Sequence, residues 1–181
     1  KASDSYNRYE EDFDLAKSMN NNSIRFGIEW ARIEPKKGVW NVDEIEHYRK
    51  VLEAAKSRGL KVVLTLWHWT NPVWLAEEKG WAGKSAVECY SNYVDLVIKE
   101  FGVYVDYWVT LNEPMVHVVN GYLTKKFPPN KRKPIQAIKV FNNLVQAHNN
   151  AYDQIHDHFP EAKVSITKLT NNFERAHKWN L

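Results

Sequence analysis

A carboxyl group directly follows an apolar segment at Asn112-Glu113-Pro114. At the end of a buried strand, flanked by Trp108 and its neighbours, the Glu113 carboxyl would resist ionisation and hold its proton near neutral pH. The alternative is a structural carboxylate that accepts hydrogen bonds from backbone amides at a helix start or in a loop. The Asn112 carboxamide offers both a donor and an acceptor, which suits a sugar hydroxyl or a turn. These residue types make Glu113 the first candidate for a general acid.

A second polar pair, His68 and Trp69, follows the apolar segment that ends at Trp67. An imidazole can hydrogen bond to a neutral hydroxyl through either ring nitrogen, and the indole of Trp69 or Trp67 can stack on the apolar face of a pyranose. The alternative for His68 is a histidine whose hydrogen bonds are satisfied within the core. Taken alone, the motif favours the core histidine, and Asn112 is undecided, so these residues by themselves leave a sugar site and a structural role both open.

Other polar residues are weaker candidates. Glu29 lies near a predicted strand end on the same face as Arg25, so it could supply a second carboxylate, although we expect it to be structural. His156 and His158 are two residues apart at a helix end, which is poor geometry for sharing a metal ion. We therefore predict no metal site. The basic residues within 125–133 surround Phe-Pro-Pro and indicate a solvated loop rather than an anion site.

Composition excludes several classes of protein. The 181 residues carry a net charge of +3 that is spread along the chain, so we predict neither a nucleic-acid nor a membrane partner. Apolar residues make up 44% and aromatic residues 13% of the chain, which excludes disorder and indicates an aromatic-rich core or pocket. The single cysteine, Cys89, permits no internal disulfide and fits a reducing compartment, so a cytoplasmic location is expected.

The elements that must position these residues alternate along the chain. Periodicity predicts helices over 9–19, 41–59, 85–101 and 134–159, and strands over 23–30, 60–67, 103–111 and 163–167; residues 171–181 receive no assignment. Asn41 and Ser85 are predicted to cap helices, and Gly59 to end one. Strict alternation predicts a parallel sheet with right-handed crossovers, either doubly wound or part of a barrel. No glycine-rich phosphate loop follows any strand, which disfavours the nucleotide-binding folds.

Apolar spacing also predicts which helix faces are buried. The predicted core stripes are Phe13, Leu15, Ala16 and Met19 in the first helix, Ile45, Tyr48, Leu52 and Ala55 in the second, and Ile135, Ile138, Leu144, Val145, Tyr152 and Ile155 in the last.

Five segments of the chain resemble glycoside hydrolase family 1, the β-glucosidases and β-galactosidases: YNRYEEDFDLAKSM, IRFGIEWARIEPKKGVWN, KVVLTLWHWTNPVWL, WVTLNEP and GYLTKKFPP. The resemblance implies that Glu113 is the catalytic acid/base and that Asn112 contacts the sugar 2-hydroxyl. It further implies that His68 and Trp69 line the sugar site. Arg25 would lie near the nucleophilic carboxylate and keep it ionised.

The same resemblance defines what the chain lacks. A complete member of the family is a (β/α)8 barrel whose first strand carries a sugar-binding Gln and whose seventh carries the nucleophile, and neither motif occurs here. We therefore expect residues 1–181 to form one α/β domain, a partial TIM barrel of about four parallel strands. It would be a piece of a longer enzyme, a natural half-barrel homologue or an engineered fragment.

The resemblance implies retaining hydrolysis of β-glucosides or related β-glycosides by the complete barrel, without a metal or an organic cofactor. Glu113 would act as acid/base, and the nucleophile would come from outside this chain, so the chain alone would be weakly active or inactive. The alternative is a non-catalytic sugar-binding or structural half-barrel. The open sheet edges of four strands also predict a partner, either a second copy of the chain or a complementary barrel half.

Overall fold

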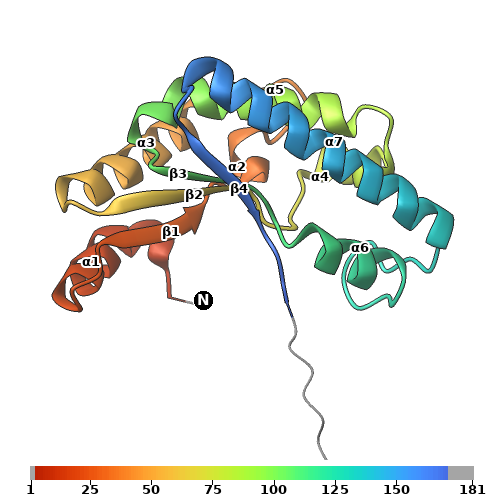
Figure 1. Cartoon of the computed structure of the whole chain (residues 1–181), viewed down its shortest axis with the longest axis horizontal. Helices are drawn as coiled ribbons and strands as arrows, with labels where there is room; N and C mark the ends of the chain where they lie inside the picture. Colours follow the sequence, from red (N-terminus) through yellow and green to blue (C-terminus); the bar gives the residue numbers. More distant parts are fainter. Residues whose placement is uncertain (1–2, 171–181) are drawn as a thin grey trace, which may run out of the picture.

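Four parallel strands form one sheet in the computed structural model, which describes residues 3–170. The strands are β1 (Ser23–Gly27), β2 (Lys61–Trp67), β3 (Tyr107–Asn112) and β4 (Lys163–Thr167), and they lie in that order across the sheet. Each strand is preceded by a long helix: α1 (Ser5–Ser18), α3 (Val42–Ser57), α5 (Ala86–Phe101) and α7 (Pro134–His158). Helices α3, α5 and α7 lie on the same side of the sheet (Figure 1). This arrangement confirms the predicted partial barrel.

Short helices that the sequence did not predict follow the carboxyl ends of three strands. They are α2 (Trp30–Ile33) after β1, α4 (Val73–Glu77) after β2 and α6 (Pro114–Tyr122) after β3; two 3₁₀ turns cover Gly80–Ala82 and Gly102–Tyr104. Pro114 at the first position of α6 was an available signal, because its fixed backbone angle suits a helix start.

Two strand boundaries differ from the prediction. Strand β1 ends at Gly27 rather than at residue 30, because the Glu29 carboxylate accepts the Ala31 N–H and starts α2. Strand β3 begins at Tyr107 rather than at 103. Just before this start, Asp106 and Val62 exchange two hydrogen bonds. The Asp106 N–H donates to the Val62 carbonyl, and the Val62 N–H donates to the Asp106 carboxylate at 2.8 Å.

The helix α3 forms as predicted. The side-chain oxygen of Asn41 accepts the N–H groups of Asp43 and Glu44, which satisfies two amides of the first turn. Gly59 has φ = 67°, the left-handed conformation that favours glycine after a helix. All four predicted core residues of this helix are buried. Ser85 is the residue before the first turn of α5 (Ala86–Phe101), as predicted, but its side chain does not cap the helix, because the hydroxyl donates to the Glu78 carboxylate instead.

The outermost helices turn apolar residues outward, against the prediction. On α7 only Leu144 and Ile155 of the predicted stripe are buried, while Ile135, Ile138, Val145 and Tyr152 are exposed. The buried face is Ala137, Val140, Leu144, Ala147, Ala151 and Ile155, and its three alanines let α7 pack closely on α5. On α1, Phe13 and Ala16 are buried but Leu15 and Met19 are exposed. Within residues 3–170 no helix is long and apolar enough to cross a membrane.

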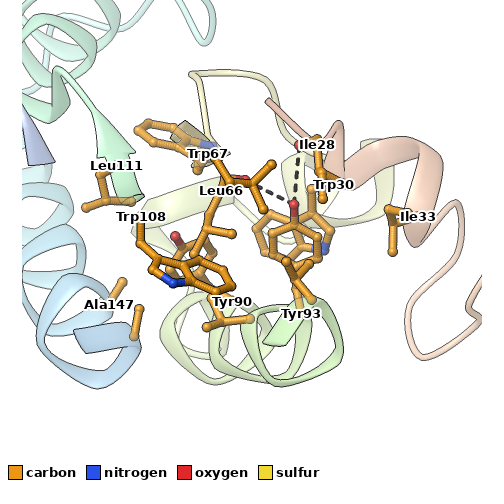
Figure 2. Packing of buried hydrophobic residues seen from close by; sticks show 14 of the residues in the cluster. Ile28, Trp30, Ile33, Leu66, Trp67, Tyr90, Tyr93, Trp108, Leu111 and Ala147 are labelled. Atoms are coloured by element: carbon orange, nitrogen blue, oxygen red, sulfur yellow. Dashed lines mark hydrogen bonds between the residues drawn. The ribbon is translucent and has the colours of Figure 1, made fainter. Parts of the chain in front are cut away.

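The core between the sheet and its helices is rich in aromatic side chains, as the composition predicts. Figure 2 shows the Tyr93 hydroxyl between the backbone oxygens of Ile28 and Leu66, at 3.2 and 3.1 Å. The Tyr93 ring stacks on the buried indole of Trp30, with ring centroids 5.1 Å apart. This side chain from α5 thereby ties the carboxyl end of β2 to the segment that follows β1.

Candidate active site

One polar side chain from each strand joins a hydrogen-bonded row across the sheet. The Arg25 guanidinium of β1 donates to the Thr65 hydroxyl of β2 at 3.0 Å and to the Asn112 side-chain oxygen of β3 at 2.5 Å. From β4, the Thr167 hydroxyl donates to the same oxygen of Asn112 at 2.8 Å. These contacts bring together residues up to 142 positions apart, from Arg25 to Thr167, and they fix the carboxyl end of β3.

The Asn112 side chain is buried, and its two polar atoms differ in their hydrogen-bond partners. Its Oδ1 accepts two hydrogen bonds, from Arg25 and Thr167. Its Nδ2 makes no hydrogen bond to any residue between 3 and 170. The carboxamide therefore offers an N–H donor to a ligand, where the sequence left both donor and acceptor open.

Glu113 starts α6 from the left-handed conformation, with φ = 44° and ψ = 57°. Its backbone N–H donates to the carbonyl oxygen and the hydroxyl of Thr167, at 3.1 and 3.2 Å. Its half-buried carboxylate does not cap the helix and bonds to no residue of the described part of the chain. The structural alternative of a capping carboxylate is therefore wrong for Glu113.

The indole beside this junction is Trp69, and the prediction that Trp108 flanks Glu113 is wrong. Figure 2 shows Trp108 in the core near Ala147, on the helix-covered side of the sheet. By contrast, the Trp69 indole N–H donates to the backbone oxygen of Asn112 at 2.9 Å. Alternation along a strand would by itself put Trp108 and Asn112, which are four residues apart, on the same face of the sheet. The register shift between Val109 and Asn112 breaks this alternation, so Trp108 faces the helices and Asn112 the other side.

Trp69 lies between two other rings at the carboxyl end of β2. Its ring is edge-on to His68, with centroids 5.0 Å apart, and tilted against Phe127 at 5.2 Å. Trp67, the alternative stacking residue, is only 1% exposed and its indole donates to Asn71. Trp67 therefore cannot stack on a ligand, whereas Trp69 is partly accessible beside a hollow of about 510 Å³ that it lines with Phe127.

His68 is exposed at the end of β2, so it is not a satisfied core histidine. Partial desolvation lowers its pKa and the Arg25 guanidinium lowers it further, while the carboxylates of Glu113 and Glu29 raise it. These charges place His68 in the same electrostatic environment as Glu113 and Arg25. A neutral imidazole can both donate to and accept from a hydroxyl.

Glu29 is committed to structural contacts. The Thr70 hydroxyl lies 2.9 Å from both oxygens of the Glu29 carboxylate, which also caps α2. Both oxygens of this carboxylate therefore have hydrogen-bond partners.

No cluster of side chains suited to a metal ion occurs within residues 3–170. The ring Nδ1 atoms of His156 and His158 contact the backbone oxygens four residues earlier, at 2.9 and 3.1 Å. The basic loop is largely exposed, as expected for a solvated segment.

The sequence did not identify two members of the site, Thr65 and Thr167. Both occupy strand positions typical of β-branched residues, so their type carries no functional signal. Their importance comes from partners 40 and 55 residues away, Arg25 and Asn112.

Comparison with known proteins identifies the family. Residues 1–177 match the model of glycosyl hydrolase family 1. The chain belongs to this family. Beta-glucosidase A of Thermotoga maritima is 30% identical over 176 residues, which cover 97% of this chain and 40% of that protein. Lactase/phlorizin hydrolase of Rattus norvegicus is 30% identical over 174 residues, covering 94% of this chain and 9% of that protein.

Solved structures of the family share the fold of this chain. The beta-glucosidase from Thermotoga maritima in complex with deoxynojirimycin matches with a TM-score of 0.91 at 29% identity, over 97% of this chain and 41% of that one. The chain therefore spans about two-fifths of the bacterial glucosidase that it matches. Family membership supports a β-glycosidase-like function and confirms that the four strands correspond to a fragment of a TIM barrel.

Proposed function

We propose that this chain carries the acid/base half of a retaining β-glycosidase site, with a β-glucoside or related β-glycoside as substrate. The observation that carries the proposal is the junction of Asn112 and Glu113. The Asn112 side chain is held by hydrogen bonds to its oxygen and keeps a free N–H donor. The next residue, Glu113, presents a carboxyl group that bonds to no described residue. His68 and Trp69 add a hydroxyl partner and a ring surface on the adjacent strand end. A similar protein was solved with deoxynojirimycin, which supports a ligand of this class.

In the proposed mechanism protonated Glu113 donates its proton to the glycosidic oxygen as the bond to the anomeric carbon breaks. A second carboxylate attacks that carbon and forms a glycosyl ester. Deprotonated Glu113 then takes a proton from water, which displaces the ester and releases the sugar. A retaining enzyme needs these carboxyl groups roughly 5–5.5 Å apart. The proposal takes the nucleophile from outside this chain and gives Arg25 the role of keeping that group ionised.

Two measurements on the chain test this function. Titration with deoxynojirimycin, followed by tryptophan fluorescence, should show binding through Trp69. Hydrolysis of an activated aryl β-glucoside should be weak or undetectable, and any activity should disappear in Glu113→Gln. Activity that survives unchanged in that variant would remove Glu113 from the mechanism. If the chain neither binds deoxynojirimycin nor hydrolyses the glucoside, the structural half-barrel is favoured instead.

We propose that the open edges of the sheet take a partner, either a second copy of the chain or a complementary barrel half. The edge strands β1 and β4 each pair on one side only among residues 3–170. Beside β4, the exposed residues Phe141 and Val145 of α7 and Ile166 of β4 border a hollow of about 280 Å³ that also reaches Glu113. Burial of this apolar surface would favour association.

A further inference from the structure

An irregularity in strand pairing places Thr167 beside Asn112. Strands β3 and β4 pair Tyr107 with Lys163 and Val109 with Ser165, but the next pair is Asn112 with Thr167. Three residues of β3 therefore oppose two of β4, which is a bulge in β3. With regular pairing Asn112 would lie opposite Lys168. Bulges next to functional sites re-aim side chains, and this one turns Asn112 toward the Thr167 hydroxyl.

The Thr167 side chain acts on two consecutive residues. Its hydroxyl donates to Oδ1 of Asn112 at 2.8 Å and accepts the Glu113 N–H at 3.2 Å. The carbonyl oxygen of Thr167 accepts the same N–H at 3.1 Å. A single residue of β4 thus holds both the side chain of Asn112 and the backbone from which the Glu113 carboxyl projects.

We infer that Thr167 is a positioning residue that fixes the orientation of the Asn112 carboxamide, an inference that rests on the proposed function. Oδ1 faces two donors, Arg25 and Thr167. The flipped carboxamide would direct its own N–H groups at both of them, which leaves donors unpaired. The fixed orientation selects ligands whose hydroxyl accepts a hydrogen bond from Nδ2 of Asn112.

Three variants separate this role from a general structural one. Thr167→Val keeps the branched shape but removes the donor, and Thr167→Ser keeps the hydroxyl. Ser165→Ala is the matched control, because within residues 3–170 this β4 hydroxyl donates only to the adjacent Ile166 carbonyl. Circular dichroism and the unfolding midpoint check that each variant folds. Two readouts are then measured: deoxynojirimycin affinity by tryptophan fluorescence, and the side-chain amide NMR signal of Asn112, assigned by its loss in Asn112→Ala.

We expect Thr167→Val to weaken deoxynojirimycin binding about fivefold to tenfold, as loss of the hydrogen bond to Asn112 predicts, and to shift the Asn112 amide signal. The Glu113 N–H keeps the Thr167 carbonyl as its acceptor. Thr167→Ser and Ser165→Ala should remain within about twofold of the unaltered chain. Equal loss in the Val and Ser variants, or unchanged binding in Thr167→Val, would overturn the inference. If the unaltered chain does not bind deoxynojirimycin, the proposed function fails. The Asn112 amide signal then still decides whether Thr167 orients the carboxamide. A shift in Thr167→Val but not in Thr167→Ser supports this role, and no shift in Thr167→Val refutes it.

Discussion

The Trp69 indole donates its N–H to the backbone carbonyl of Asn112 at 2.9 Å, and this bond joins the ends of β2 and β3. It holds the ring that lines the candidate sugar site against the strand that carries Glu113. Trp74 makes a comparable bond outside the site, from its indole to the carbonyl of Glu34 at 2.9 Å. The two tryptophans therefore form a matched pair for mutation.

Trp69→Phe and Trp74→Phe should each lower the free energy of unfolding by about 1–2 kcal/mol, because each leaves a carbonyl without its donor and reduces the packed surface. Only Trp69→Phe should weaken deoxynojirimycin binding. Denaturant unfolding measures the first effect, and isothermal titration calorimetry measures the second, because Trp69→Phe removes the indole that is expected to report binding by fluorescence. Equal losses of affinity in both variants would show that Trp69 acts through stability alone.

The two carboxylates Glu113 and Glu34 should respond differently to the same substitution. Glu113→Gln should change the free energy of unfolding by less than about 0.5 kcal/mol, because its carboxylate bonds to no described residue. Glu34 is buried, and its two oxygens accept from the Trp30 indole and the Gly38 N–H, each at 2.7 Å. Glu34→Gln places an amide N–H against either the Trp30 indole N–H or the Gly38 N–H and should lower the free energy of unfolding by about 1–3 kcal/mol. A large loss for Glu113→Gln would indicate a structural role for that carboxyl.

Stability should fall in acid through His117. Burial lowers its pKa to about 4, and it packs edge-on against Trp67 with ring centroids 5.0 Å apart. Between pH 6.5 and 4 the unfolded chain takes up a proton at this residue and the folded chain does not. His117 therefore lowers the free energy of unfolding hardly at all at pH 7 and by about 3 kcal/mol below pH 4.

His117→Phe should reduce this acid sensitivity, while His158→Gln at an exposed position should leave it unchanged. Unfolding free energies measured between pH 7 and 4 provide the comparison. The same pH dependence in His117→Phe as in the unaltered chain would assign the acid effect to other groups.

The exposed apolar face of α7 should drive self-association. Light scattering at micromolar concentration should give at least a dimer, and Val145→Lys should shift the chain toward the monomer. Val103→Lys serves as the control, because Val103 is 77% exposed on the turn before β3, away from this face. A monodisperse monomer of the unaltered chain would contradict self-association and leave a complementary barrel half as the partner.

The sequence by itself determined the alternation of helices and strands and the strand ends where Glu113, Asn112, His68 and Trp69 lie. It could do so because apolar periodicity, Asn41 as a cap and Gly59 as a helix stop are local properties of the chain. The order of the strands does not follow from these properties, since right-handed crossovers allow either a doubly wound sheet or a barrel. The resemblance to a family of barrel enzymes favoured the barrel. Segments that resemble a glycosidase family then indicated which of these strand ends to propose as the site.

Only the tertiary structure decided which polar groups are free to act. Glu29 and Glu113 both precede short helices, yet Glu29 is engaged by Thr70 and Glu113 by no described side chain. Likewise the bulge in β3 sets the contact between Asn112 and Thr167, and packing on α5 sets which face of α7 is buried. These outcomes depend on partners tens of residues away, and local spacing cannot encode the register or the packing that brings such partners within hydrogen-bond distance.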